Sequence, residues 1–350
     1  MKNITKIIVS SLISFAISFS AFAGELTVTG SAKATYGTVS GYANGDNGLA
    51  VSNELGFGAS GEMDNGWTWN YAVALDPART AAGGAAINDD SSLKLTTPFG
   101  TVAVCSSDCG LSVHGGFSAN AYAWITDTGF DEGKVEPTNL SSYQNIQYHT
   151  PAGLLPFGIV GKVGYATSGS TILESNNASN ITRSDTVGNT TYYAIETKPI
   201  DGLALNVSYG EQDGGIVAGQ TDEQKSEQGA VAAKYSMGSV TFGASRSWHA
   251  PVIADVTGSG ATTVEHYINT NYSLGLAVNE NLSVSYSDET SDVNYQTSTT
   301  VGYDVKAKSI QAAYTMGGMT LAVARTNYDN VGYVNNADVT ETIVSVNFAF

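Results

Sequence analysis

Apolar and polar side chains alternate over much of this chain, with a period of two residues. Residues 340–350 show the pattern clearly, because every second side chain falls on one face: Thr342, Val344, Val346, Phe348 and Phe350. Side chains of a β-strand point alternately to its two faces, so these segments are predicted to be strands with one apolar face. About 16 such segments recur, each near the ~9–11 residues of a tilted membrane-crossing strand.

The predicted strands are joined by connections that are alternately short and long. Tight turns are indicated by glycine-containing sequences, among them Asp64-Asn65-Gly66, Pro98-Phe99-Gly100, Asp201-Gly202 and Gly317-Gly318. The longest connection covers residues 105–141. Within residues 303–316 the apolar positions change parity, from Val305 and Ala307 to Ile310 and Ala312, which predicts a β-bulge.

The predicted fold class is all-β: residues 24–350 form a transmembrane antiparallel β-barrel with a long inward-folded loop after strand 5. No stretch after residue 23 approaches the ~20 apolar residues of a spanning helix. A barrel leaves no unpaired edge, so its apolar face can lie in lipid. Aromatic residues support this, because they fall at both ends of the predicted strands, as expected at two membrane interfaces.

Residues 1–23 have the pattern of a secretory signal peptide rather than of a strand. Lys2 and Lys6 precede an apolar run at residues 7–19, and Ala21-Phe22-Ala23 is a small-x-small cleavage sequence before Gly24. Removing these residues takes the formal charge from −17 to −19. Such acidity argues against a nucleic-acid partner, which requires a basic surface. Charged residues make up 13% of the chain, which is low for a soluble surface.

Together these features resemble the general, non-specific porins of Gram-negative outer membranes, especially the alphaproteobacterial type. The resemblance covers the mature chain. It rests on the signal peptide, the number of hairpins, the long loop after the fifth strand and the alternation of apolar residues up to Phe350. Three stretches resemble porin hairpins: Gly66-Trp67-Thr68-Trp69-Asn70-Tyr71, Thr97-Pro98-Phe99-Gly100-Thr101-Val102 and Asn145-Ile146-Gln147-Tyr148-His149-Thr150-Pro151. The resemblance implies a homotrimer and an integral outer-membrane location. It also implies that Phe348 and Phe350 form an assembly signal read by the outer-membrane assembly machinery.

The same resemblance implies that the loop at residues 105–141 narrows the pore and sets its selectivity. The loop is acidic, and its predicted constriction residues are Asp127, Asp131, Glu132 and Glu136. In the resembling family, loop carboxylates face a basic cluster on the opposite wall. Lys33 and Lys94 are the candidates for that cluster, because their parity points them inward; the alternative is that the loop acids are ordinary solvated charges.

Cys105 and Cys109 lie close together in a chain that is predicted to be secreted, so a small disulfide at the base of the loop is expected. The alternative is two free thiols. No metal site is expected, because the histidines are scattered. The alternative is calcium bound by carboxylate and carbonyl oxygens at one of three acidic segments, Asn44-Gly45-Asp46-Asn47-Gly48, Asn88-Asp89-Asp90 and residues 329–338, although none matches a regular calcium loop.

The predicted function is a water-filled channel for passive diffusion of ions and small hydrophilic solutes. The acidity favours a weak preference for cations. Arg325 near the outer rim is a candidate contact for lipopolysaccharide phosphates; the alternative is that its side chain only snorkels toward water. No enzyme is predicted, since the sequence has no Gly-x-Ser-x-Gly, P-loop or His-Glu-x-x-His motif. The alternative in the same class is a substrate-specific channel, which requires an aromatic track inside the lumen. An outer-membrane enzyme or adhesin on a barrel is the more distant alternative.

Overall fold

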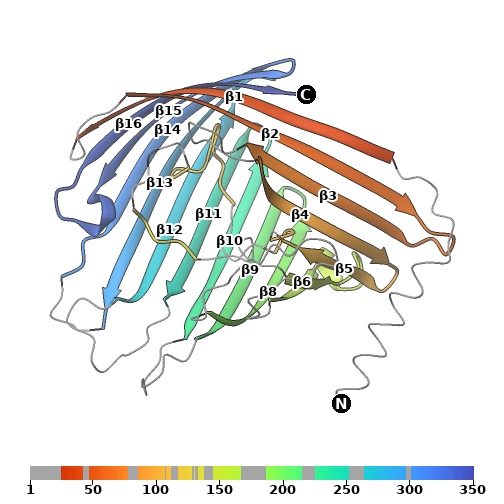
Figure 1. Cartoon of the computed structure of the whole chain (residues 1–350). Helices are drawn as coiled ribbons and strands as arrows, with labels where there is room; N and C mark the ends of the chain where they lie inside the picture. The colour runs from red at the N-terminus through yellow and green to blue at the C-terminus, as the bar shows by residue number, and fades with distance from the viewer. Residues whose placement is uncertain are drawn as a thin grey trace.

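The computed structural model describes residues 25–41, 47–77, 86–106, 108–111, 117–127, 130, 133–137, 145–166, 187–214, 225–251, 264–296 and 301–350. These residues form one closed barrel (Figure 1), in which each strand pairs antiparallel with its neighbours in sequence order. The strands are β1 (Glu25–Gly41), β2 (Asn47–Glu62), β3 (Thr68–Pro77), β4 (Ala86–Thr97), β5 (Gly100–Cys105), β6 (Asn145–His149), β7 (Val160–Ala166), β8 (Val187–Ile200), β9 (Leu203–Gly214), β10 (Ser226–Met237), β11 (Val240–Ala250), β12 (Val264–Ala277), β13 (Leu282–Tyr295), β14 (Val305–Met316), β15 (Met319–Asp329) and β16 (Val339–Ala349).

The first and last strands close the barrel by pairing along most of their length. Their register runs from Ser31 opposite Ala349 to Gly41 opposite Val339. Beyond the strand end, Gly30 and Phe350 exchange two backbone hydrogen bonds of 2.8 and 3.0 Å. The predicted fold class and strand number are therefore confirmed. Two short 3-10 helices, η2 (Pro156–Gly158) and η3 (Val331–Tyr333), lie in connections, and no helix among the described residues is long and apolar enough to cross a bilayer.

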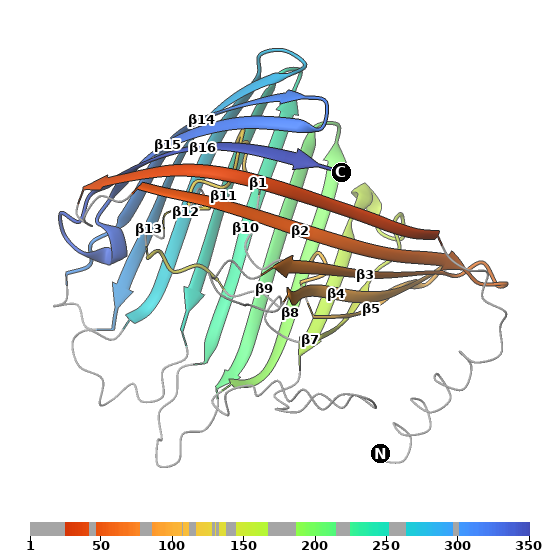
Figure 2. The same cartoon turned by 45° about the horizontal axis from the view of Figure 1, so that its top comes forward.

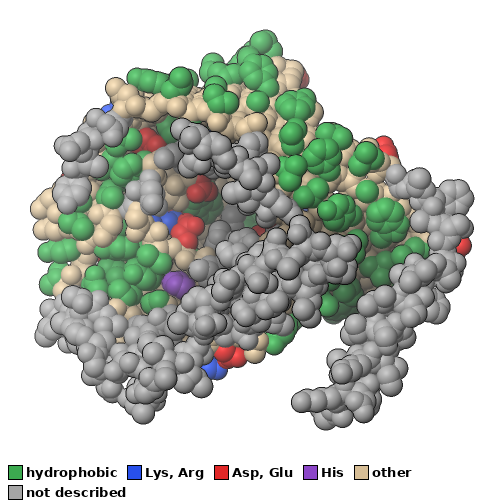
Figure 3. Space-filling view, viewed as in Figure 1, with side chains coloured by type: hydrophobic (Ala, Val, Ile, Leu, Met, Phe, Trp, Pro, Cys, Tyr) green, Lys and Arg blue, Asp and Glu red, His purple; other side chains and the backbone are tan. Residues whose placement is uncertain are grey.

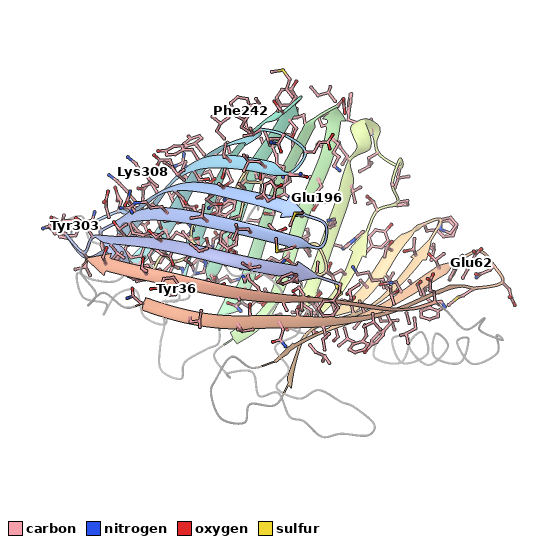
Figure 4. All side chains as sticks on the ribbon, turned by 90° about the horizontal axis from the view of Figure 1, so that it is seen from above. Tyr36, Glu62, Glu196, Phe242, Tyr303 and Lys308 are labelled. Atoms are coloured by element: carbon pink, nitrogen blue, oxygen red, sulfur yellow. A yellow bond between two sulfur atoms is a disulfide. The ribbon has the colours of Figure 1, made fainter. Side chains whose placement is uncertain are left out.

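The wall has an apolar outer face and a polar inner face, as the alternation predicts. On β16 the outward Val344 and Phe348 are exposed, whereas the inward Glu341 and Ser345 are buried. Tyr36 and Phe242, labelled in Figure 4, belong to the outer face and are about half exposed. Large side chains that an isolated barrel leaves exposed in this way are those that lipid or another subunit covers.

The β-bulge predicted within residues 303–316 is wrong. β14 pairs with β13 and with β15 in unbroken register, and Val305 and Ala307 point inward while Lys306 and Lys308 point outward. The parity change in the sequence has a different cause. Ala307 lies in a buried apolar cluster with Ile125, a residue of the long connection after β5. Part of the inner wall is therefore apolar because a loop covers it.

A charged side chain on the lipid face of β16 is expected to destabilise the barrel. Val344→Lys should lower the free energy of unfolding by ~2–4 kcal/mol, because Val344 lies outward near the middle of the strand. Urea unfolding in lipid vesicles measures this. The matched control is Asn347→Lys, on the inward face of the same strand, for which a much smaller change is expected. Equal effects at both positions would contradict the assignment of faces.

Candidate functional site: the loop that folds into the barrel

The connection between β5 and β6 folds into the lumen and lies along the inner wall of β11 to β15. The backbone N–H groups of Ala119 and Ala121 donate to the hydroxyls of Ser273 and Ser285, both at 2.8 Å. Gln311 of β14 accepts from the N–H of Tyr122 at 3.0 Å and donates to the carbonyl of Ala123 at 3.0 Å. The coil drawn in yellow beside β11–β13 in Figure 1 and Figure 2 is this segment.

Small residues on the wall let the loop backbone approach this closely. A Cβ atom at Gly243 would collide with the carbonyl oxygen of Phe117, and one at Gly275 would collide with that of Ala119. Both glycines lie on strands and have no unusual φ, so the reason for glycine here is space. Alanine at either position would push the loop away from the wall.

An apolar cluster fixes the middle of the loop. Ile125 is fully buried against Ala307, Tyr328 and Val339, and the loop's Trp124 and Phe130 pack on the same cluster. The hydroxyl of Tyr328 also donates to the carbonyl of Ile125 at 3.2 Å. Burial of these side chains inside an otherwise polar lumen gives the loop one preferred position.

A buried ion group fixes the far part of the loop. Lys134 contacts the carboxylates of Glu136, on the loop, and Glu289, on β13, and the exposed fractions of the Lys134 and Glu289 side chains are only 3% and 2%. Asn271 donates a further hydrogen bond of 2.8 Å to Glu289. Nearby, Tyr333 accepts from the N–H of Val135 at 3.0 Å.

The charge state of Lys134 follows from this arrangement. Burial alone lowers the pKa of Lys134, but the carboxylates of Glu289 and Glu136 raise it more, so the pKa lies above the ordinary value of 10.5. A lysine whose pKa is raised on folding contributes stability that is fully present below its unfolded pKa. That contribution is lost only as the pH rises through the raised pKa. The contacts of Lys134 with Glu136 and Glu289 therefore hold the loop at neutral pH.

The base of the loop is held at the opposite wall. A disulfide joins Cys105 and Cys109, and the Cα atoms of the two residues are 6.3 Å apart. Lys162 of β7 donates to the carbonyl of Gly110 at 2.6 Å and forms an ion pair with Glu196 at 2.7 Å. Leu111 is buried in a small cluster with Tyr192. The described parts of the loop are thus fixed at two walls of the lumen, one at β7 and β8 and the other along β11 to β15.

The lumen that remains beside the loop is polar. Around the loop tip a cavity of about 420 Å³ is bounded by β1, β2, β15, β16 and the loop residues Ala121 and Tyr122. The Nζ atom of Lys33 lies 6.0 Å from the centre of the Tyr122 ring. In Figure 3, acidic and basic side chains and a histidine are visible around the hollow in this face, while hydrophobic side chains gather over the strands to its right.

The predicted site residues are only partly brought together. Asp127 is exposed on the loop, whereas Glu136 binds Lys134 at the wall instead of facing a basic cluster across the pore. Asp131 and Glu132 lie outside the described residues. Lys33 of β1 is paired with Ser52 of β2. Lys94 of β4 is paired with Asn70 of β3, which in turn is paired with Ser60 of β2. Those two serines are ~27 Å apart along β2 at about 3.4 Å per residue, so Lys33 and Lys94 do not form one cluster.

The residues that hold the loop were not predicted from the sequence. Most are polar or small inward residues of the wall, namely Gly243, Ser273, Gly275, Ser285, Glu289, Gln311 and Tyr328; the last, Tyr333, lies in η3. The signal available was a run of inward glycines and serines on neighbouring strands, which indicates close approach of another backbone. Glu289, an inward acid on such a wall, indicates a buried cation as its partner.

No cluster of metal-ligating side chains occurs among the residues that the structure describes. In the acidic segment at residues 329–338, side-chain oxygens shape the turn: Asp338 accepts from the N–H of Asn330 at 3.2 Å, and Asn330 accepts from the N–H of Asn336 at 3.0 Å. The residues at 44–46 lie outside the described part of the chain.

A closed barrel with an apolar exterior, a polar lumen and an inward-folded loop defines a membrane channel. The sequence matches the Gram-negative porin family over residues 9–350, and the chain belongs to that family. It is therefore an integral outer-membrane protein that forms a channel for passive diffusion, and it is not an enzyme. The predictions of family, location and channel function are confirmed at this level.

Solved structures share the fold at low sequence identity. An anion-selective porin from Comamonas acidovorans is 14% identical, with a TM-score of 0.67 over 93% of this chain and 100% of that one. Salmonella typhi OmpF in complex with daunomycin is 14% identical, with a TM-score of 0.63 over 94% and 98%. The loop-deleted OmpT of Vibrio cholerae is 12% identical, with a TM-score of 0.64 over 94% and 100%. No curated protein matches the sequence.

Removing the charge of Lys134 is expected to loosen the loop. Lys134→Met leaves Glu289 buried without its cation, which costs about 3–5 kcal/mol of loop attachment. Single-channel recording should then show larger current noise, and protease should cleave the loop faster. The double variant Lys134→Met/Glu289→Leu should recover much of the loss, because the remaining acid, Glu136, is partly exposed to water.

The control for this prediction is Lys225→Met. Lys225 also contacts two acids, Glu211 and Asp213, but it is exposed outside the lumen, so no change in current noise is expected. If the current noise of Lys134→Met were no larger than that of Lys225→Met, the buried ion group would not hold the loop in place.

Proposed function

We propose that this porin is a homotrimer with a weak preference for cations. The observation that carries the selectivity is that carboxylates outnumber lysines on the inward face and the loop. The carboxylates include Glu25, Glu54, Glu62, Asp90, Asp108, Asp127, Glu136, Glu196, Glu289 and Glu341, and the lysines include Lys33, Lys94, Lys134, Lys162 and Lys234. A lumen lined by an excess of one charge raises the local concentration of the opposite ion.

Asp127 and Glu136, together with Asp131 and Glu132, remain the proposed constriction acids on the loop. Asp127 is the exposed member among those described, which supports this role for its charge. Glu136 is offset by Lys134, and we assign it a smaller share of the field.

The proposed trimer rests on the outer surface of the first strands. Large apolar side chains are exposed there, including Leu26, Val28, Tyr71, Leu93 and Val104. A contiguous apolar face of this kind suits a subunit interface, with lipid as the other possible cover.

Two further contacts are proposed on the outer surface. At the long-loop end, Lys306, Lys308 and Arg325 point outward on adjacent strands, which suits phosphate groups of lipopolysaccharide. Phe348 and Phe350 are exposed beside the closing strand pair, and we retain them as the assembly signal.

A substrate-specific channel is the second candidate, because the lumen contains an aromatic series that the sequence did not reveal. The His249 and Tyr267 rings are stacked with centres 6.5 Å apart, and Tyr267 is 5.3 Å from Tyr333. Tyr333 also holds the loop through Val135, which favours a structural role for this series. Current block by one sugar at low concentration would favour the specific channel.

Planar-bilayer recording in a salt gradient tests the proposal. Conductance steps should occur in groups of three, and the reversal potential should show a mild cation preference. Asp127→Asn should reduce the cation-to-anion permeability ratio by less than about fivefold, because a single exposed charge in water contributes about 1 kcal/mol or less. Glu211→Gln, on the outward face, is the control and should change nothing. An anion preference in the unmodified protein would refute the proposed selectivity.

A further inference from the structure

The cavity at the loop tip bears one charge of each sign. Lys33 of β1 and Glu54 of β2 both line it, with Ser31, Ser52, Ser345 and Asn347 completing its polar wall. Its volume of about 420 Å³ suits a small organic solute. We call it the Lys33–Glu54 cavity.

Register places the two charges side by side on one wall. Lys33 is opposite Ser52, and Ser31 is opposite Glu54, so Lys33 and Glu54 are diagonal neighbours on the inward face. Such diagonal neighbours lie about 7–8 Å apart, and their Cβ atoms are somewhat closer. Within the described ranges neither side chain forms an ion pair, although Lys134 and Lys162 elsewhere in the lumen both do. The Glu54 side chain is exposed and Lys33 is half-buried, so both can meet a solute.

The loop adds an aromatic side chain to this pair. Tyr122 lies across from Lys33, and its backbone N–H is held by Gln311 at 3.0 Å, so the tip carrying the ring has a fixed position. The face of an aromatic ring attracts cations and also gives apolar contact to a hydrocarbon chain.

We propose that the Lys33–Glu54 cavity binds small dipolar solutes that carry a carboxylate and an ammonium group. The carboxylate pairs with Lys33, the ammonium pairs with Glu54, and the carbon chain between them lies against Tyr122. A simple anion forms an ion pair with Lys33 but is repelled by Glu54. A simple cation forms an ion pair with Glu54 but is repelled by Lys33, and a neutral solute forms neither ion pair. Because the two charges lie on neighbouring strands, a solute whose charges are several bonds apart fits better than one with adjacent charges.

This inference rests on the proposed diffusion path past the loop tip, and it identifies dipolar solutes as the class that binds there during passage. The porin would remain a passive channel. The cavity would make the passage of dipolar solutes saturable at concentrations where matched solutes of single charge pass without saturation.

The test uses the purified protein in a planar bilayer with potassium chloride and four probes of matched size: γ-aminobutyrate, butyrate, butylammonium and butyramide. γ-Aminobutyrate is expected to interrupt the single-channel current at a concentration about tenfold lower than any of the other three, since it alone forms two charge-assisted contacts.

Variants separate the two charges. Glu54→Gln should abolish this advantage and make butyrate the strongest of the four probes, whereas Lys33→Gln should abolish it and make butylammonium the strongest. Tyr122→Phe should keep the advantage, and Tyr122→Ala should reduce it. The matched control is Glu62→Gln: this acid lies inward on the same strand but at its far end, as Figure 4 shows, and does not line the cavity, so the order of the probes should not change.

Two results would overturn the inference. One is an equal effect of all four probes on the unmodified channel; the other is the same change of probe order in Glu62→Gln as in Glu54→Gln. Neither bears on the channel itself, because conductance in potassium chloride alone measures that. A protein that conducts but does not discriminate among the probes refutes the cavity inference and leaves the diffusion channel intact.

Discussion

The requirement that every backbone N–H and C=O in a bilayer be hydrogen-bonded within the protein determines most of this structure. A sheet satisfies that requirement only if it closes, and here β1 and β16 close it over most of their length. Closure in turn fixes which side chains face lipid and which face the lumen. A barrel of this many strands is too wide for its inward side chains to fill, so it contains a channel. Which solutes pass through the channel depends on the part of the chain that folds into the lumen.

The connection after β5 enters the lumen and is held by several different interactions. Hydrogen bonds to Ser273, Ser285 and Gln311 fix its first part, an apolar cluster at Ile125 fixes its middle, and the Lys134–Glu289 pair fixes its end. Each interaction uses a side chain that points inward from the wall. The polar lining of the barrel therefore has two roles: part of it binds the loop, and the remainder faces the solutes.

The strands and their closure could be predicted from the sequence because each strand records its surroundings in its own residues. Alternation in β3 or β16 reflects lipid on one side and polar lumen on the other, independent of distant contacts. β14 was mispredicted because one of its surroundings is not recorded in its own residues. Ala307 faces inward beneath a loop that is distant in sequence, so an inward position is apolar there.

The arrangement of the site could not be predicted in the same way. That Glu136 pairs with Lys134 and Glu289, and that Lys33 meets Glu54 but not Lys94, depends on register between strands and on the path of the loop. Parity gave the correct face for Lys33 and Lys94, but the relative height of two strands is not contained in either strand alone. The net acidity of the lumen could be predicted from the sequence, but the positions of its charges relative to one another could not.

The central claim is that the loop lies against the inner wall of β11 to β15 and narrows the channel. Cross-linking tests it most directly, with Ala121→Cys on the loop and Ser285→Cys on β13 in a background where Cys105 and Cys109 are replaced by serine. Because the N–H of Ala121 donates to Ser285 at 2.8 Å, mild oxidation in native membranes should join the two cysteines in high yield and leave the conductance nearly unchanged. No cross-link, or a cross-link that forms only with a large fall in conductance, would show that the loop normally lies elsewhere.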